Sequence, residues 1–178
     1  MRKQLVEIFP QLSEIADASL RGLVERCWLT ALERGGWTIE DLERIPFSLM
    51  SDMGEISLAA HTRNVTDCSV AVGKVMNNSG IAAFKVDMDL LTAGGLLHDV
   101  GKALEYSFNG EKWVVSSQGR MLRHPISGAA LAFELKLPEA LQHIIAVHSH
   151  EGDKSRSTTE AWIVHHCDFI NFDPIKKK

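Results

Sequence analysis

The sequence has few cysteines, one tyrosine, no apolar run long enough to cross a membrane, and no basic cluster apart from residues 176–178. Cys27, Cys68 and Cys167 form no Cys-x-x-Cys pair, so a structural zinc site is not predicted. An odd number of unpaired thiols is typical of a cytoplasmic protein rather than of a disulfide-bonded secreted one. The absence of a long apolar segment or of a signal peptide predicts no membrane association. A net charge of −4 without a basic stripe predicts no dedicated nucleic-acid surface.

What is present is a helical pattern with one interruption. The 178 residues are 45% hydrophobic, which is enough for one globular domain with a substantial core. Apolar residues at helical spacing predict helices over 12–34, 55–77, 88–99, 125–135, 138–148 and 158–172, with a short helix over 38–45. Asn109-Gly110, flanked by apolar residues, predicts a small β-hairpin. We therefore expect an all-α fold with a hairpin insert.

The adjacent pair His98-Asp99 is the strongest chemical signal. Neighbouring side chains on a helix are about 100° apart, so both face one ion only near a helix end. Gly101 directly afterwards allows the helix to end there. Taken alone, the pair is equally well explained as a C-terminal histidine beside a solvated aspartate.

Further histidines and an aspartate lie at positions from which they could bind the same ion. His61 lies within an apolar helix, Asp168 lies between apolar neighbours, and His124, His148 and His150 lie at helix ends. Taken singly, each histidine is better explained as a core or exposed polar residue than as a ligand. Together they suit a divalent transition metal, namely manganese, iron, cobalt, nickel or zinc, rather than calcium.

The order of these residues resembles the HD-domain metal-dependent phosphohydrolase superfamily. The resemblance runs from about residue 61 to 173, roughly two thirds of the chain, and rests on His61, His98-Asp99-Val100-Gly101-Lys102, His124-Pro125, His148 and Asp168. It implies a helical bundle with a central metal site. We expect residues 51–178 to form this domain and residues 1–50 to form an N-terminal helical extension. The apolar side chains of that extension either pack against the bundle or form a homodimer surface; they are Trp28, Leu32, Trp37 and Phe47.

The resemblance also implies roles for individual residues. A first cation would be bound by His61, His98, Asp99 and Asp168, and a second by His124 and His148, with Asp99 as bridge. His150 is an alternative or additional ligand, because some relatives have two adjacent histidines here. Lys102 would face a substrate phosphate, and Arg123 is placed to bind an anionic substrate. Asp99 and Lys102 are thus the expected catalytic residues.

The implied activity is hydrolysis of a small phosphate ester, a nucleotide or a phosphorylated metabolite, by a metal-activated hydroxide. An alternative stays open, because some relatives with two irons use oxygen to cleave C–C or C–P bonds. Glu151-Gly152-Asp153 stands where relatives that hydrolyse cyclic dinucleotides have Gly-Tyr-Pro, which disfavours that substrate. Gly101 to Glu105 lacks the Glu-Asp pair of relatives that hydrolyse guanosine tetraphosphate, which disfavours that substrate as well.

Overall fold

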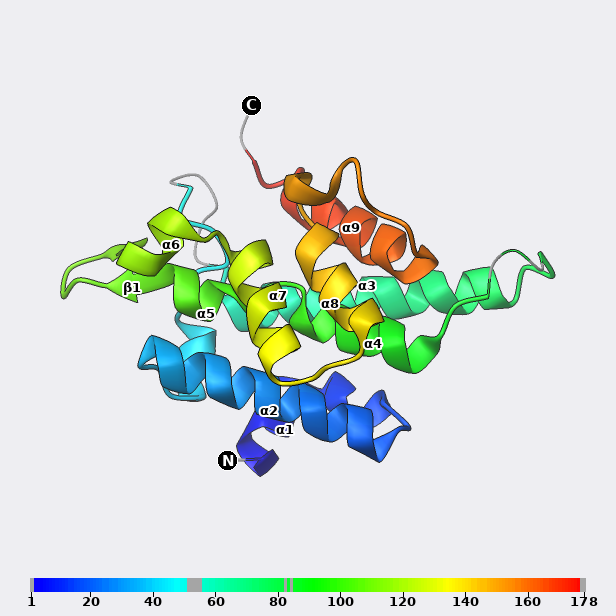
Figure 1. The fold of residues 1–178 in the computed structure, drawn as a ribbon, viewed down its shortest axis with the longest axis horizontal. Coiled ribbons are helices and arrows are strands. Elements are labelled where there is room, and N and C mark those ends of the chain that lie inside the picture. Colours follow the sequence, from blue (N-terminus) through cyan, green and yellow to red (C-terminus); the bar gives the residue numbers. More distant parts are fainter. Residues whose placement is uncertain (1, 51–55, 82, 84, 177–178) are drawn as a thin grey trace.

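The computed structural model describes residues 2–50, 56–81, 83 and 85–176. Within these residues the fold is all-α with one antiparallel pair of three-residue strands, as predicted (Figure 1). The elements in order are α1 (Arg2–Ile8), α2 (Ala18–Gly35), α3 (Leu58–Asn77), α4 (Met88–Leu97), α5 (Lys102–Glu105), β1 (Tyr106–Phe108), β2 (Trp113–Val115), α6 (Ser117–Met121), α7 (His124–Glu134), α8 (Glu139–Val147) and α9 (Thr159–Phe172), with 3-10 turns at Pro10–Glu14, Glu40–Glu43 and His150–Gly152.

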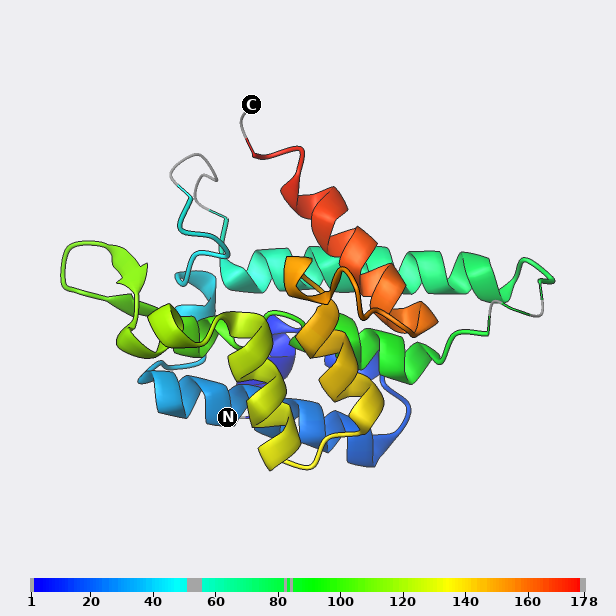
Figure 2. The ribbon, with the colours of Figure 1, turned by 45° about the horizontal axis from the view of Figure 1, so that its top comes forward.

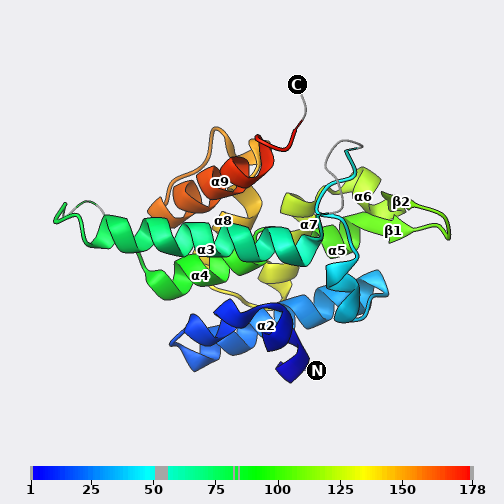
Figure 3. The same cartoon turned by 180° about the vertical axis from the view of Figure 1, so that it is seen from behind.

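Helices α3 and α4 form the centre of the molecule. They run side by side, with α2 below them and α9 above, as Figure 3 shows from behind. Figure 2 shows α9 crossing over α3, while the hairpin projects at one end of the bundle. Gly95 allows the close approach of α3 and α4, because a Cβ there would lie 2.9 Å from the Cα of Thr66. This contact places the end of α4, and with it His98-Asp99, inside the bundle.

The N-terminal helices belong to the same hydrophobic core as the bundle. Trp28 on α2 is fully buried, and its indole Nε1 donates a hydrogen bond of 3.0 Å to the carbonyl oxygen of Leu96 on α4. Leu32 and Phe47 are also buried. The sequence left open whether these side chains pack on the bundle or form a dimer surface. For Trp28 the structure answers this question, because its side chain packs on the bundle. The predicted boundary between residues 50 and 51 adjoins residues 51–55, which lie outside the described residues.

Side-chain capping corrects several predicted element boundaries. The helix predicted over 12–34 begins only at Ala18, because the Asp17 carboxylate accepts hydrogen bonds from the amides of Ser19 and Leu20. The helix predicted from 55 begins at Leu58, because the Ser57 hydroxyl accepts from the amide of Ala60; Glu55 lies outside the described residues.

The predicted hairpin is confirmed, and its turn is longer than the common two-residue hairpin turn. Phe108 pairs with Trp113, so four residues connect the strands. The Asn109 side chain accepts hydrogen bonds from the amides of Glu111 and Lys112, and it thereby stabilises the longer turn. The short helices α5 and α6 on either side of the hairpin were not predicted from the sequence.

Candidate metal centre

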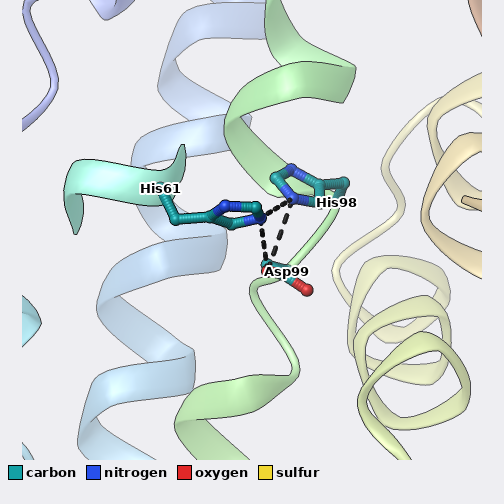
Figure 4. Close-up of side chains that lie close together, drawn as sticks. All are labelled: His61, His98 and Asp99. Atoms are coloured by element: carbon teal, nitrogen blue, oxygen red, sulfur yellow. Dashed lines mark hydrogen bonds and ion pairs between the residues drawn. The ribbon is translucent and has the colours of Figure 1, made fainter. Parts of the chain in front are cut away.

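Helix ends bring the predicted ligands together around Asp99. His61 comes from α3, His98 and Asp99 follow α4, and Figure 4 shows their three side chains converging. His124 begins α7 and His148 directly follows α8. Gly101 allows α7 to approach, because a Cβ there would lie 2.2 Å from the carbonyl oxygen of His124.

The two oxygens of Asp99 face different pairs of imidazoles. Asp99 Oδ2 lies 3.5 Å from Nε2 of His61 and 3.4 Å from Nε2 of His98. Asp99 Oδ1 lies 3.3 Å from Nε2 of His124 and 3.6 Å from Nε2 of His148. Each pair of imidazoles, together with Asp99, forms a buried group whose donor atoms are close enough to hold one cation.

Hydrogen bonds at Nδ1 show which ring nitrogen carries the proton in three of these histidines. Nδ1 of His98 donates to the carbonyl of Gly95 at 2.7 Å, and Nδ1 of His148 donates to the carbonyl of Ile145 at 2.8 Å. Nδ1 of His124 donates to the Glu105 carboxylate at 2.6 Å. Since carbonyl and carboxylate oxygens only accept, Nδ1 carries the proton in each case, and each ring in its neutral form presents a lone pair at Nε2.

The Nε2 atoms of these rings face the Asp99 carboxylate, which is also only a hydrogen-bond acceptor. Nε2 of His148 is buried and has no hydrogen-bond partner among the described residues. A buried polar atom without a partner is costly, and a divalent cation between imidazole and carboxylate would satisfy both groups. The residues present therefore fit a metal centre.

Asp168 and Lys102 complete the charged cluster. Asp168 on α9 lies 3.0 Å from Nε2 of His61 through its Oδ1. The Lys102 ammonium donates a hydrogen bond of 2.6 Å to Asp99 Oδ2, and the Lys102 side chain is buried. His61, His98, Asp99, His124, His148 and Asp168 are thus assembled in one place, with Lys102 beside them.

Burial and charge pairing oppose each other in the pKa values of this cluster. Burial alone would raise the pKa of Asp99, but Lys102 and His98 hold it well below its usual range. Burial likewise acts to raise the pKa of Asp168, yet hydrogen bonding to His61 lowers it to about 2. Burial lowers the pKa of His124 to about 4, despite the opposing effect of Glu105. Both aspartates are therefore ionised and His124 is neutral near pH 7, as metal ligands must be.

A cavity of about 500 Å³ opens onto this cluster. Its polar lining includes Asp99, Lys102, Glu105, Arg123, His124 and Asp168, and its apolar lining includes Phe47, Tyr106, Phe169 and Phe172. That volume is sufficient for a small organic phosphate. Phe47 stacks on the ring of His61 at a centroid distance of 4.5 Å, and the Lys102 ammonium lies 5.4 Å from the Phe47 ring.

His150 and Arg123 lie farther out than the metal-ligand candidates. The His150 side chain is 73% exposed, and its Nδ1 faces Asp153 Oδ2 at 3.4 Å rather than Asp99. The structure does not bring His150 into either group of donor atoms. Arg123 lines the cavity and is 55% exposed, with its guanidinium 3.3 Å from Glu151 and 4.0 Å from Glu105.

The sequence did not identify Glu105 or Phe47 as residues of the site. Glu105 is buried and bonded to His124, nineteen positions further along the chain. Phe47 precedes α3 and is positioned by backbone hydrogen bonds between its segment and the start of that helix. No spacing or motif links either residue to the histidines, so only the fold reveals them.

Comparison with models of known protein families identifies the family of this chain. The family model described as HD domain matches residues 58–171, which contain all six clustered ligand candidates. The chain belongs to the HD-domain family. Phe47 and Phe172 form part of the cavity wall. Both residues lie outside the range 58–171 that the family model matches.

Known relatives of this HD domain are longer proteins. Ribonuclease Y of Thermoanaerobacter pseudethanolicus is 30% identical over 114 residues, which is 63% of this chain and 19% of that protein. Ribonuclease Y of Mycoplasma mycoides is 31% identical over 144 residues, which is 78% of this chain and 30% of that protein. The chain thus spans less than a third of the length of either relative. No solved structure matches the chain. Within the described part of the chain, no helix is both long and apolar enough to span a membrane.

Proposed function

We propose that this HD domain hydrolyses a small phosphate ester, such as a nucleotide or a phosphorylated metabolite, at a centre of two divalent cations. The proposal rests on one observation, which is that the two carboxylate oxygens of Asp99 face different pairs of histidines. Oδ2 faces His61 and His98, and Oδ1 faces His124 and His148. A carboxylate placed in this way is suited to bridge two cations. Asp168 would complete the ligands of the cation at His61 and His98. His148 would complete the ligands of the cation at His124, and the exposed His150 would not take part.

The chain's own residues then bind and orient the substrate. Divalent cations bound here would supply Lewis acidity toward phosphate oxygens and lower the pKa of a coordinated water. The Lys102 ammonium has three N–H donors, of which one meets Asp99, so the others can donate to a phosphate oxygen in the cavity. Arg123 at the cavity wall adds a second positive charge for an anionic substrate.

Metal analysis tests the centre before any substrate is known. Protein purified without added metal should contain two equivalents of a transition metal, and His148→Gln should lose one of them. His143→Gln is the matched control, because His143 is half-buried and its Nε2 accepts a hydrogen bond from the Ser157 amide, so the metal content of this variant should be unchanged. Full metal content in His148→Gln would refute the assignment of the second group.

Turnover then distinguishes the candidate reactions. Metal-stripped protein reloaded with manganese under anaerobic conditions should release phosphate from nucleoside monophosphates or phosphorylated metabolites. Turnover that requires iron and oxygen would overturn the hydrolase in favour of the diiron oxygenase. Because the relatives are named ribonucleases, a short RNA oligonucleotide belongs in the same assay. Cleavage of the RNA without release of phosphate from small esters would overturn the small-substrate part of the proposal.

A further inference from the structure

Glu105, at the end of α5, holds His124 through one carboxylate oxygen that accepts two hydrogen bonds from it. Its Oε2 accepts from the His124 backbone amide at 2.6 Å and from His124 Nδ1 at 2.6 Å. The side chain is buried, with 7% of the residue exposed, and its pKa is lowered by His124 in spite of burial. Both the start of α7 and the orientation of the imidazole therefore depend on Glu105.

Glu105 differs from the groups that hold the neighbouring rings. His98 and His148 donate their Nδ1 protons to the backbone carbonyls of Gly95 and Ile145. A carboxylate is a stronger acceptor than a carbonyl, so it fixes the Nδ1–H tautomer more firmly and makes Nε2 a better ligand. Nε2 of His124 is the atom that lies 3.3 Å from Asp99 Oδ1.

The hairpin and α6 hold Glu105 in place. The Glu105 carbonyl accepts a hydrogen bond of 2.8 Å from the Ser116 amide, just after β2. Gly119 on α6 lies against Glu105 so closely that a Cβ there would be 2.3 Å from the Glu105 carbonyl oxygen. The hairpin insert thus returns the chain to the end of α5 and supports the residue that orients His124.

We propose that Glu105 is a positioning residue that holds His124 in the orientation and tautomer needed to bind the second cation. This inference rests on the proposed two-cation centre. It assigns Glu105 a role that acts through His124, because Oε2 of Glu105 is engaged by His124, while Oε1 lies 4.0 Å from the guanidinium of Arg123. Its effect should therefore be confined to the group of Asp99, His124 and His148.

Binding of manganese alone tests the inference without an activity assay. Calorimetric titration of the metal-stripped protein should give two equivalents, and Glu105→Gln should weaken one of them about 10- to 100-fold while leaving the other unchanged. Glutamine has nearly the same shape as glutamate but no charge. The matched control is Glu160→Gln, because Glu160 is similarly buried and also accepts a backbone hydrogen bond, from Asp87, while no hydrogen bond or ion pair among the described residues joins it to a ligand candidate.

The outcomes separate this inference from the proposed function. Wild-type affinity for both equivalents in Glu105→Gln would overturn the role of Glu105 and leave the two-cation centre intact. Fewer than two equivalents in the wild type would overturn the centre itself, and the role of Glu105 with it.

A second measurement does not require the variant to fold. Nitrogen NMR of the histidine rings in the metal-free wild type should show His124 as the Nδ1–H tautomer at pH 7. The Nε2–H tautomer there would overturn the inference.

Discussion

Acidification should lower the free energy of unfolding of the metal-free wild type more steeply than that of a metal-free His124→Gln variant. Burial lowers the pKa of His124 to about 4, from an ordinary value of 6.5. Below pH 6.5 the unfolded chain therefore binds a proton at His124 that the folded protein does not bind, and stability falls as pH falls. Integration of this difference gives a loss of about 2 kcal/mol between pH 7 and pH 4.5 from His124 alone.

Neighbouring groups do not reverse the sign in this pH range. The pKa of His61 is also lowered by burial, so it adds to the loss. The pKa of His98 is raised by Asp99 against the effect of burial, so the stability it contributes is complete below pH 6.5 and is lost only as pH rises. The aspartate pKa values lie below their usual range, so both carboxylates stay ionised above pH 4.5.

Urea denaturation in the presence of a chelator, followed from pH 7 to pH 4.5, measures this loss. The wild type should lose about 2 kcal/mol more than His124→Gln over that range. Glutamine can still donate to Glu105, which keeps the variant comparable. His143→Gln, which alters a half-buried histidine outside both groups of ligand candidates, should follow the wild type. Equal pH dependence in the wild type and His124→Gln would refute the assignment of a buried, neutral His124.

Two further substitutions test the substrate contact and the helix packing beneath the site. Lys102→Met should retain both metal equivalents but lower kcat by about 10²- to 10³-fold, because the proposed contact between the ammonium and the substrate phosphate is lost. Unchanged turnover would remove Lys102 from substrate binding. Gly95→Ala should lower the free energy of unfolding by about 1–3 kcal/mol in urea denaturation, because its Cβ would clash with the backbone of Thr66. Gly22→Ala on α2 is the control, since nothing lies within 4 Å of a Cβ there, and it should stabilise the protein by about 0.5–1 kcal/mol.

The sequence by itself determined the fold class and the ligand candidates. Helical spacing of apolar residues is a local property, so the helices over 125–135, 138–148 and 158–172 were predicted to within about a residue of α7, α8 and α9. The spacing of His61, His98-Asp99, His124, His148 and Asp168 carried the family resemblance, which the match to the HD-domain model bears out. The capping by Asp17 and the four-residue turn at Asn109 depended on side-chain hydrogen bonds that periodicity does not reveal.

The tertiary structure decided which of these groups meet and how. It brought His148 to Asp99 and left His150 exposed, although only Ser149 separates the two histidines in sequence. It also joined Glu105 to His124 and stacked Phe47 on His61, contacts between segments that share no sequence pattern. The physical reason is that hydrophobic periodicity specifies the buried face of each helix, whereas the distance between two buried polar groups depends on how the helices cross. In this protein that crossing is set at close contacts such as Gly95 against Thr66 and Gly101 against His124.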